Sequence, residues 1–136
     1  MRRLFAAVLL LSLATALAAT TSAAKEGVHA RVATPVPRDA RPGTTVTVVW
    51  TLYSVDAGTR TPFGADGIFI RLFGPGAART PRAFATELAP GRYRARPRIP
   101  RGGVRRVAIG LMGTGCDASG CRPSPGLFRI VGPALR

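Results

Sequence analysis

The sequence contains few of the side chains that enzymes most often use for catalysis. Only one of its 136 residues is histidine, His29, two are cysteine, Cys116 and Cys121, and asparagine and glutamine are absent. The absence of asparagine excludes N-linked glycosylation, which needs an Asn-X-Ser/Thr acceptor. The chain also lacks a G-x-S-x-G sequence, which excludes the nucleophile elbow of α/β-hydrolases. We therefore expect a protein that is not an enzyme and that carries no cofactor.

Acidic side chains are scarce as well. The chain has 6 Asp and Glu residues against 20 Lys and Arg, a net charge of +14, and Lys25 is the only lysine. One interpretation is that the arginines bind an anionic partner. The other is that a G+C-rich genome, through its codon usage, places arginine at exposed positions that have no function.

The N-terminal residues have the three-part layout of a secretory signal peptide. A positively charged start precedes an apolar run over residues 4–17, and small side chains lie just before Lys25. We expect cleavage after Ala24, with cleavage after Ala18 as a second possibility. This gives a signal peptide over residues 1–24.

A retained membrane anchor is the alternative interpretation of this segment. Residues 4–24 form a run of 21 uncharged residues, and about 20 apolar residues are enough to cross a bilayer. No second apolar stretch of that length follows, so the mature chain is expected to have no transmembrane span. Residues 25–136 then form one domain, secreted or held in the periplasm or cell envelope of a bacterium.

Period-two alternation of apolar and polar residues predicts short β-strands along this domain. Over residues 45–53, Val46, Val48, Trp50 and Leu52 share one face, and β-branched residues fill most other positions. No long stretch shows helical spacing, and 16 glycines and 12 prolines interrupt the chain. The other predicted strands cover residues 28–33, 67–73, 82–88, 92–99, 104–111 and 127–131.

This pattern predicts an all-β fold, an antiparallel immunoglobulin-like β-sandwich of about seven strands. A closed β-barrel is the competing architecture. Pro97 cannot donate to a strand ladder, so the strand over residues 92–99 is expected at a sheet edge or with a frayed end. Trp50 is expected in the core, and Tyr93 resembles the tyrosine that pins a strand corner in immunoglobulin-like domains.

Cys116 and Cys121 are expected to form a disulfide, because they are a close, even pair in an exported chain. A dithiol that binds a soft metal such as Cu(I), or a redox pair, is the alternative. The surrounding sequence, Gly113 to Ala118, matches G-x-G-x-x-A, but the glycines and prolines that follow exclude the helix a dinucleotide site needs. We expect a Gly-rich loop there.

Arginine occupies every second position from residue 92 to residue 98. In a strand such residues share one face about 6.6 Å apart, close enough to interact at a screening length of about 8 Å. They could clamp phosphates or carboxylates of an anionic polymer. The candidate anion-binding residues are Arg92, Arg94, Arg96 and Arg98.

A copper site is the third possibility, since exported β-sandwiches often bind copper through His and Met. Only His29 and Met112 remain after removal of the signal peptide. Copper and other soft metals need three or four converging ligands. These two residues are therefore weak metal candidates, and no metal is expected.

Residues 90–95 contain a turn followed by an aromatic residue, and residues 99–103 lead into the next strand. This pattern resembles the C-terminal half of YtkA-like and FixH-like exported β-sandwich domains. The resemblance implies an immunoglobulin-like fold and a role in the cell envelope, in some relatives connected with metals. The His and Met clusters of copper-handling relatives are missing here.

Together these observations predict an exported, non-catalytic β-sandwich module of the envelope or extracellular space. The alternative is a polyanion-binding protein that uses the arginine-rich strand face, and the third hypothesis is a copper-handling accessory protein. The sequence leaves the partner unknown, and an anionic envelope polymer and another envelope protein are the two candidates. Nucleic acid is not expected, because export separates the protein from it.

Overall fold

The computed structural model describes residues 27–136, so the expected signal peptide lies outside the described residues. All regular secondary structure in this part of the chain is β. The strands are β1 (Val28–Val32), β2 (Val48–Asp56), β3 (Thr59–Pro62), β4 (Ile68–Phe73), β5 (Ala83–Phe84), β6 (Thr86–Ala89), β7 (Arg92–Ala95), β8 (Arg106–Asp117), β9 (Gly120–Leu127) and β10 (Arg129–Ile130).

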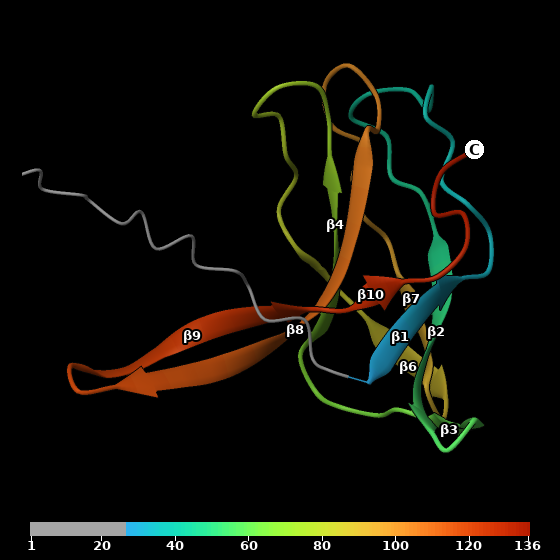
Figure 1. The fold of residues 1–136 in the computed structure, drawn as a ribbon. Coiled ribbons are helices and arrows are strands. Elements are labelled where there is room, and N and C mark those ends of the chain that lie inside the picture. The colour runs from blue at the N-terminus through green and yellow to red at the C-terminus, as the bar shows by residue number, and fades with distance from the viewer. Residues whose placement is uncertain (1–26) are drawn as a thin grey trace, which may run out of the picture.

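These strands form two sheets that face each other (Figure 1). A six-stranded sheet has the order β10-β1-β2-β7-β6, with β3 paired to β2, and a four-stranded sheet has the order β5-β4-β8-β9. All pairs are antiparallel except β1 with β10. Four neighbours of the larger sheet, β1-β2-β7-β6, follow the A-B-E-D order of immunoglobulin-like domains, and the smaller sheet follows the order C′-C-F-G. The prediction of an all-β sandwich is confirmed.

The core forms because alternate residues of the strands point between the sheets. On β2, Val48, Trp50 and Leu52 are at most 1% exposed. They belong to one apolar cluster with Ile70 of β4 and Ile109 of β8, on the opposite sheet. The prediction that Trp50 belongs to the core is therefore confirmed. With a core made mostly of aliphatic side chains, burial of apolar surface is the main source of stability.

Several strand predictions differ from the structure. Of the predicted strand over residues 127–131, Leu127 ends β9, which was not predicted, and Arg129–Ile130 form β10. Residues 82–88 divide into β5, in the four-stranded sheet, and β6, in the other sheet. The strand that starts at Arg92 ends at Ala95, because Pro97 interrupts it, yet β7 is an interior strand between β2 and β6. The hairpin strand β3 was not predicted; it follows a two-residue turn at Ala57 and Gly58, whose positive φ values of 45° and 81° suit a type I′ turn.

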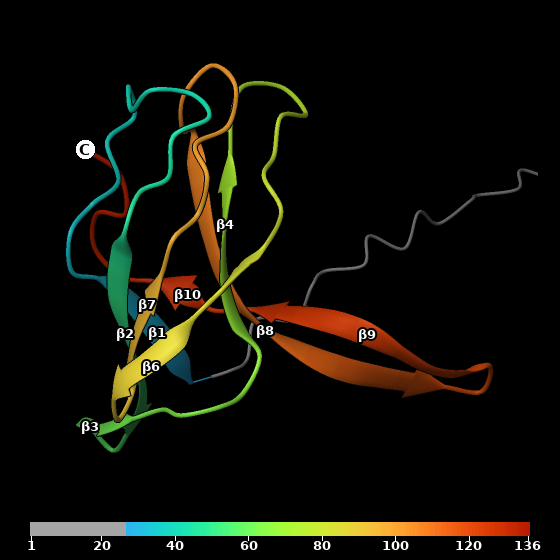
Figure 2. The ribbon, with the colours of Figure 1, turned by 180° about the vertical axis from the view of Figure 1, so that it is seen from behind.

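The prediction of a Gly-rich loop over residues 113–118 is wrong, because this segment belongs to a long β-hairpin. Strands β8 and β9 stay paired from Gly110 and Leu127 to Asp117 and Gly120, and they project away from the sandwich (Figures 1 and 2). Every residue from 113 to 124 is exposed. Prolines are tolerated on β9 because it is an edge strand, where their missing N–H groups need not serve the sheet. We call residues 113–124 the arm.

Candidate anion-binding surface

Strand β7 presents two arginines to solvent and two residues to the core. Tyr93 and Ala95 are buried, and Arg92 and Arg94 are exposed. The alternation continues beyond the strand, so that Arg96 and Arg98 are exposed and Pro97 between them is buried. The Nε–H of Arg98 donates a hydrogen bond of 2.9 Å to the carbonyl oxygen of Gly43, which holds this end of the row in place.

Further arginines join this row from strands that are distant in sequence. Thr51 of β2 lies opposite Arg92 on one side and opposite Arg31 of β1 on the other. Because neighbouring strands are about 4.8 Å apart, the Arg31 and Arg92 backbones are separated by about 9.6 Å. On β10, Arg129 lies beside His29 of β1.

The hairpin strand β3 contributes one more arginine. Arg60 is paired with Val55 of β2, and its guanidinium carbon lies 4.9 Å from the centre of the Tyr53 ring, within cation–π range. Together these positions form the outer face of the six-stranded sheet, which we call the arginine face. It consists of Arg31, Arg60, Arg92, Arg94, Arg96, Arg98 and Arg129.

Carboxylates do not neutralise the arginine face. Residues 27–136 contain 17 arginines and five Asp or Glu residues. By register, none of the outward positions on the strands of this sheet carries a carboxylate. Glu87 of β6 lies opposite buried Tyr93 and therefore on the inner side, where its Oε1 accepts a 2.9 Å hydrogen bond from the Gly91 N–H.

A shallow depression of about 380 Å³ lies on this face. Arg31 and Arg60 line it, with Tyr53, Thr51 and Pro90 among the other lining residues. Two guanidinium groups beside an aromatic ring can hold a sulfate, phosphate or carboxylate group and provide a surface for a sugar ring. Sequence reasoning missed Arg31 although its outward position follows from the alternation within residues 28–33; it missed Arg60 because β3 itself was not predicted.

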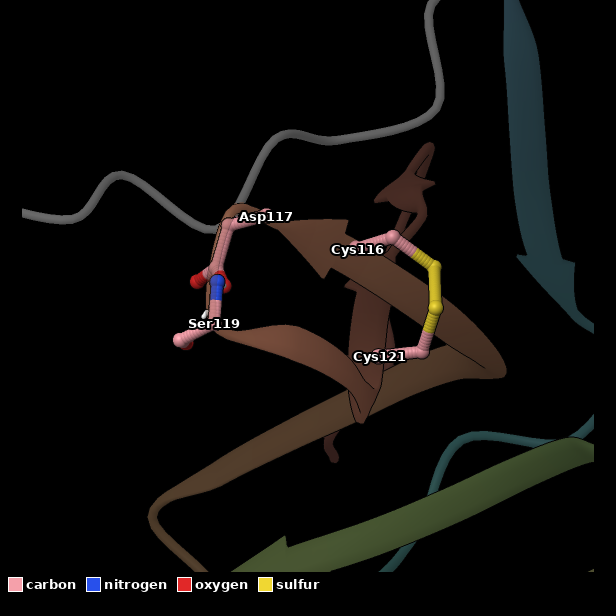
Figure 3. Close-up of a disulfide and its surroundings, with 4 residues drawn as sticks. All are labelled: Cys116, Asp117, Ser119 and Cys121. Carbon is pink, nitrogen blue, oxygen red and sulfur yellow. Dashed lines mark hydrogen bonds between the residues drawn. A yellow bond between two sulfur atoms is a disulfide. The ribbon is translucent and has the colours of Figure 1, made fainter.

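The predicted disulfide between Cys116 and Cys121 is present, with a Cα–Cα distance of 4.0 Å (Figure 3). The two cysteines are directly opposite each other across β8 and β9. At the tip of the arm, Asp117 Oδ1 accepts hydrogen bonds from the backbone N–H and the hydroxyl of Ser119, at 2.8 and 2.5 Å. These bonds stabilise the ionised form and lower the pKa of the Asp117 carboxyl. The disulfide and the turn together hold the tip closed.

The two weak metal candidates are located on different sheets. His29 lies on β1 and Met112 on β8. The His29 ring packs against Tyr53 with the ring centres 5.7 Å apart. Among residues 27–136, no group of three His, Cys, Asp or Glu side chains is arranged to hold a metal ion. Within the same part of the chain, both cysteines are used in the disulfide.

Comparisons with known proteins do not identify a relative of this chain: no model of a protein family and no curated protein matches it. In the described part of the chain, no helix could span a lipid bilayer.

Proposed function

We propose that this chain is an exported, non-catalytic β-sandwich module that binds an anionic polymer of the cell envelope through the arginine face. The observation that carries the proposal is the convergence of seven arginines from four regions of the chain on one carboxylate-free sheet face. The resemblance to YtkA-like and FixH-like domains is compatible with an envelope location and stays a prediction. Export likewise stays part of the proposal.

The geometry of the face suits an extended ligand with repeated charges. The row from Arg92 to Arg98 gives charges about every 6.6 Å along the chain direction, and Arg31 and Arg60 widen it across the sheet. Guanidinium groups bind phosphate, sulfate and carboxylate through paired N–H donors, which a lysine ammonium does not offer. The paired strands also fix the spacing of the arginine backbones before the ligand arrives, which lowers part of the entropic cost of binding.

The absence of a free thiol in residues 27–136, together with the single histidine, supports a role in binding rather than catalysis. The disulfide fits an oxidising compartment outside the cytoplasm. Both observations agree with the proposed module.

The test is the binding of fluorescein-labelled dextran sulfate, followed by anisotropy over a series of NaCl concentrations. If all seven arginines contact the polymer, log K should fall with log[salt] with a slope of about −5, taking about 0.7 per contact as for single-stranded nucleic acids. The double variant Arg94→Glu, Arg96→Glu should weaken binding and reduce the slope to about −3.5.

The matched control is Arg101→Glu with Arg122→Glu, which changes the net charge by the same amount. Both residues are exposed and lie outside the strands of the six-stranded sheet, Arg101 in the loop before β8 and Arg122 on β9 in the arm. This variant should keep most of the affinity. Equal losses in the two double variants would show that net charge alone drives binding, and salt-independent binding would also refute the proposal.

A further inference from the structure

A second group of arginines lies on the opposite side of the molecule, on the outer face of the four-stranded sheet. Arg71 lies on β4 and is paired with Ala108 of β8, while Arg106 of β8 is paired with Phe73. These two arginines are therefore diagonal neighbours. Strand β5 pairs with β4 at Ile70 and Ala83, and this register, extended by one residue, places Arg82 directly opposite Arg71.

This arrangement sets like charges against each other. Directly opposite positions in an antiparallel pair have Cβ atoms about 5 Å apart, and like charges at such positions are destabilising. By register, the outward positions of β4, β5, β8 and β9 carry no carboxylate that could compensate them. Burial, and then the positive charges of Arg82 and Arg79, lower the pKa of Arg71. The group lacks an anionic partner within the described protein.

Aromatic rings hold two of these arginines beside the third. The guanidinium carbon of Arg106 lies 3.8 Å from the centre of the Phe73 ring, and that of Arg82 lies 5.2 Å from the centre of the Phe69 ring. Such stacking leaves the edge of the guanidinium, which carries the N–H groups, free to bind an acceptor. The Nε atoms of Arg71 and Arg82 are buried and have no hydrogen-bond partner. Buried donors without an acceptor are rare in folded proteins, and a water molecule or an ion that completes the site is one explanation for them.

The three arginines line one cleft of about 220 Å³, whose other wall includes Pro125 and Leu127 of β9. Pockets for drug-sized molecules usually measure about 300–1,000 Å³, so this cleft suits only a small ligand. The arginines approach from three positions. A carboxylate offers its acceptor sites on two oxygens in one plane, whereas a phosphate or sulfate monoester presents three terminal oxygens, one for each arginine. The arrangement therefore suits a tetrahedral oxyanion better than a carboxylate.

We propose that this cleft binds the head group of a phosphate or sulfate monoester, with its short apolar substituent against Pro125 and Leu127. The site lies on the other sheet from the arginine face and takes a single head group rather than a polymer. It therefore goes beyond the proposed function and does not depend on it.

The experiment compares thermal unfolding and calorimetric titration of the full chain with inorganic phosphate, inorganic sulfate and phenyl phosphate, each against chloride at matched ionic strength. All three should raise the melting temperature, and phenyl phosphate should bind most tightly because its ring can pack on the apolar wall. Sodium acetate serves as the planar, two-oxygen comparison. An equal effect of acetate would refute the tetrahedral class, and no increase with any of these anions would refute the site.

The central variant is Arg71→Met, which keeps a long side chain and removes the middle charge. The substitution should raise the melting temperature in chloride, because it removes charge repulsion and a buried unpaired donor. It should also weaken the binding of phenyl phosphate at least tenfold. The matched control, Arg94→Met on the arginine face, should bind phenyl phosphate like the wild type. If phenyl phosphate bound Arg71→Met as tightly as the wild type and raised its melting temperature by as much, the anions would act through a general salt effect, and the proposal would be overturned.

Two further measurements make the outcome decisive. Arg106→Gln, at an exposed position, tests the same cleft if Arg71→Met does not fold, and it too should weaken phenyl phosphate at least tenfold. Dextran sulfate binding should be unchanged in Arg71→Met, so that a failure of this site is distinguishable from a failure of the arginine face. If Arg71→Met lost affinity for phenyl phosphate and for dextran sulfate to the same extent, the two sites would not be independent.

Discussion

The hydroxyl of Tyr93 gives the sharpest stability prediction. Its ring lies in the core beside Trp50, with the ring centres 6.2 Å apart. Its oxygen accepts a 3.1 Å hydrogen bond from the Ala65 N–H and donates one of 3.3 Å to the Phe63 carbonyl. These residues belong to the segment that passes from β3 in one sheet to β4 in the other. The hydroxyl therefore holds the segment that crosses from one sheet to the other. The sequence had predicted a different role, in which Tyr93 resembles the tyrosine that pins a strand corner in immunoglobulin-like domains.

Tyr93→Phe keeps the ring packing and removes both hydrogen bonds. A net hydrogen bond contributes about 0.5–1.5 kcal/mol, and a partly buried donor left without an acceptor costs about 1–3 kcal/mol, so we expect a loss of about 2 kcal/mol. Urea unfolding can be followed by the fluorescence of Trp50, the only tryptophan in the sequence, which is fully buried. The control is Tyr53→Phe on the outer face, with an expected change below about 0.5 kcal/mol.

The same residue predicts a pH dependence. Burial, the largest cause, raises the pKa of Tyr93 above its ordinary value, so the folded state favours the protonated phenol. This contribution to stability is complete below the unfolded-state pKa of about 10 and is lost as the pH rises through the folded-state value. Tyr93→Phe should remove this alkaline loss. A Phe variant as stable as the wild type, with the same alkaline pH profile, would refute the reasoning.

Two further predictions concern the hairpin of β8 and β9. Replacing both Cys116 and Cys121 by serine should lower the free energy of unfolding by at most about 2 kcal/mol, the loop-entropy value for so short a ring. Hydrogen exchange should show lost protection in the arm alone; loss throughout the sandwich would contradict an independent arm. Gly110→Ala should cost about 1–3 kcal/mol by overpacking, because an added Cβ would lie 2.7 Å from Cζ of Phe69 and still closer to the Gly126 carbonyl oxygen. Gly113→Ala, whose Cβ would lie 3.4 Å from the nearest atom, is the control, and equal losses in urea unfolding would disprove this account.

Much of the fold was predictable because its signals are local. The alternation around Trp50 and around Ile70 comes from strand geometry alone, in which successive side chains point to opposite faces. The same rule put Arg92 and Arg94 on one exposed face. The spacing of Cys116 and Cys121 was short enough to predict a disulfide without knowledge of the surrounding structure.

Local sequence patterns thus determined most of the core strands and which of their side chains share a face, but they did not show β3 or the paired strands of the arm. Tertiary structure alone decided which strands become neighbours, because pairing and register depend on contacts between residues that are distant along the chain. It divided residues 82–88 between two sheets, extended the β8–β9 hairpin into an exposed arm, and brought Arg31 and Arg60 to the row on β7. The same long-range pairing set Arg71 between Arg82 and Arg106, a juxtaposition of like charges that no local pattern encodes.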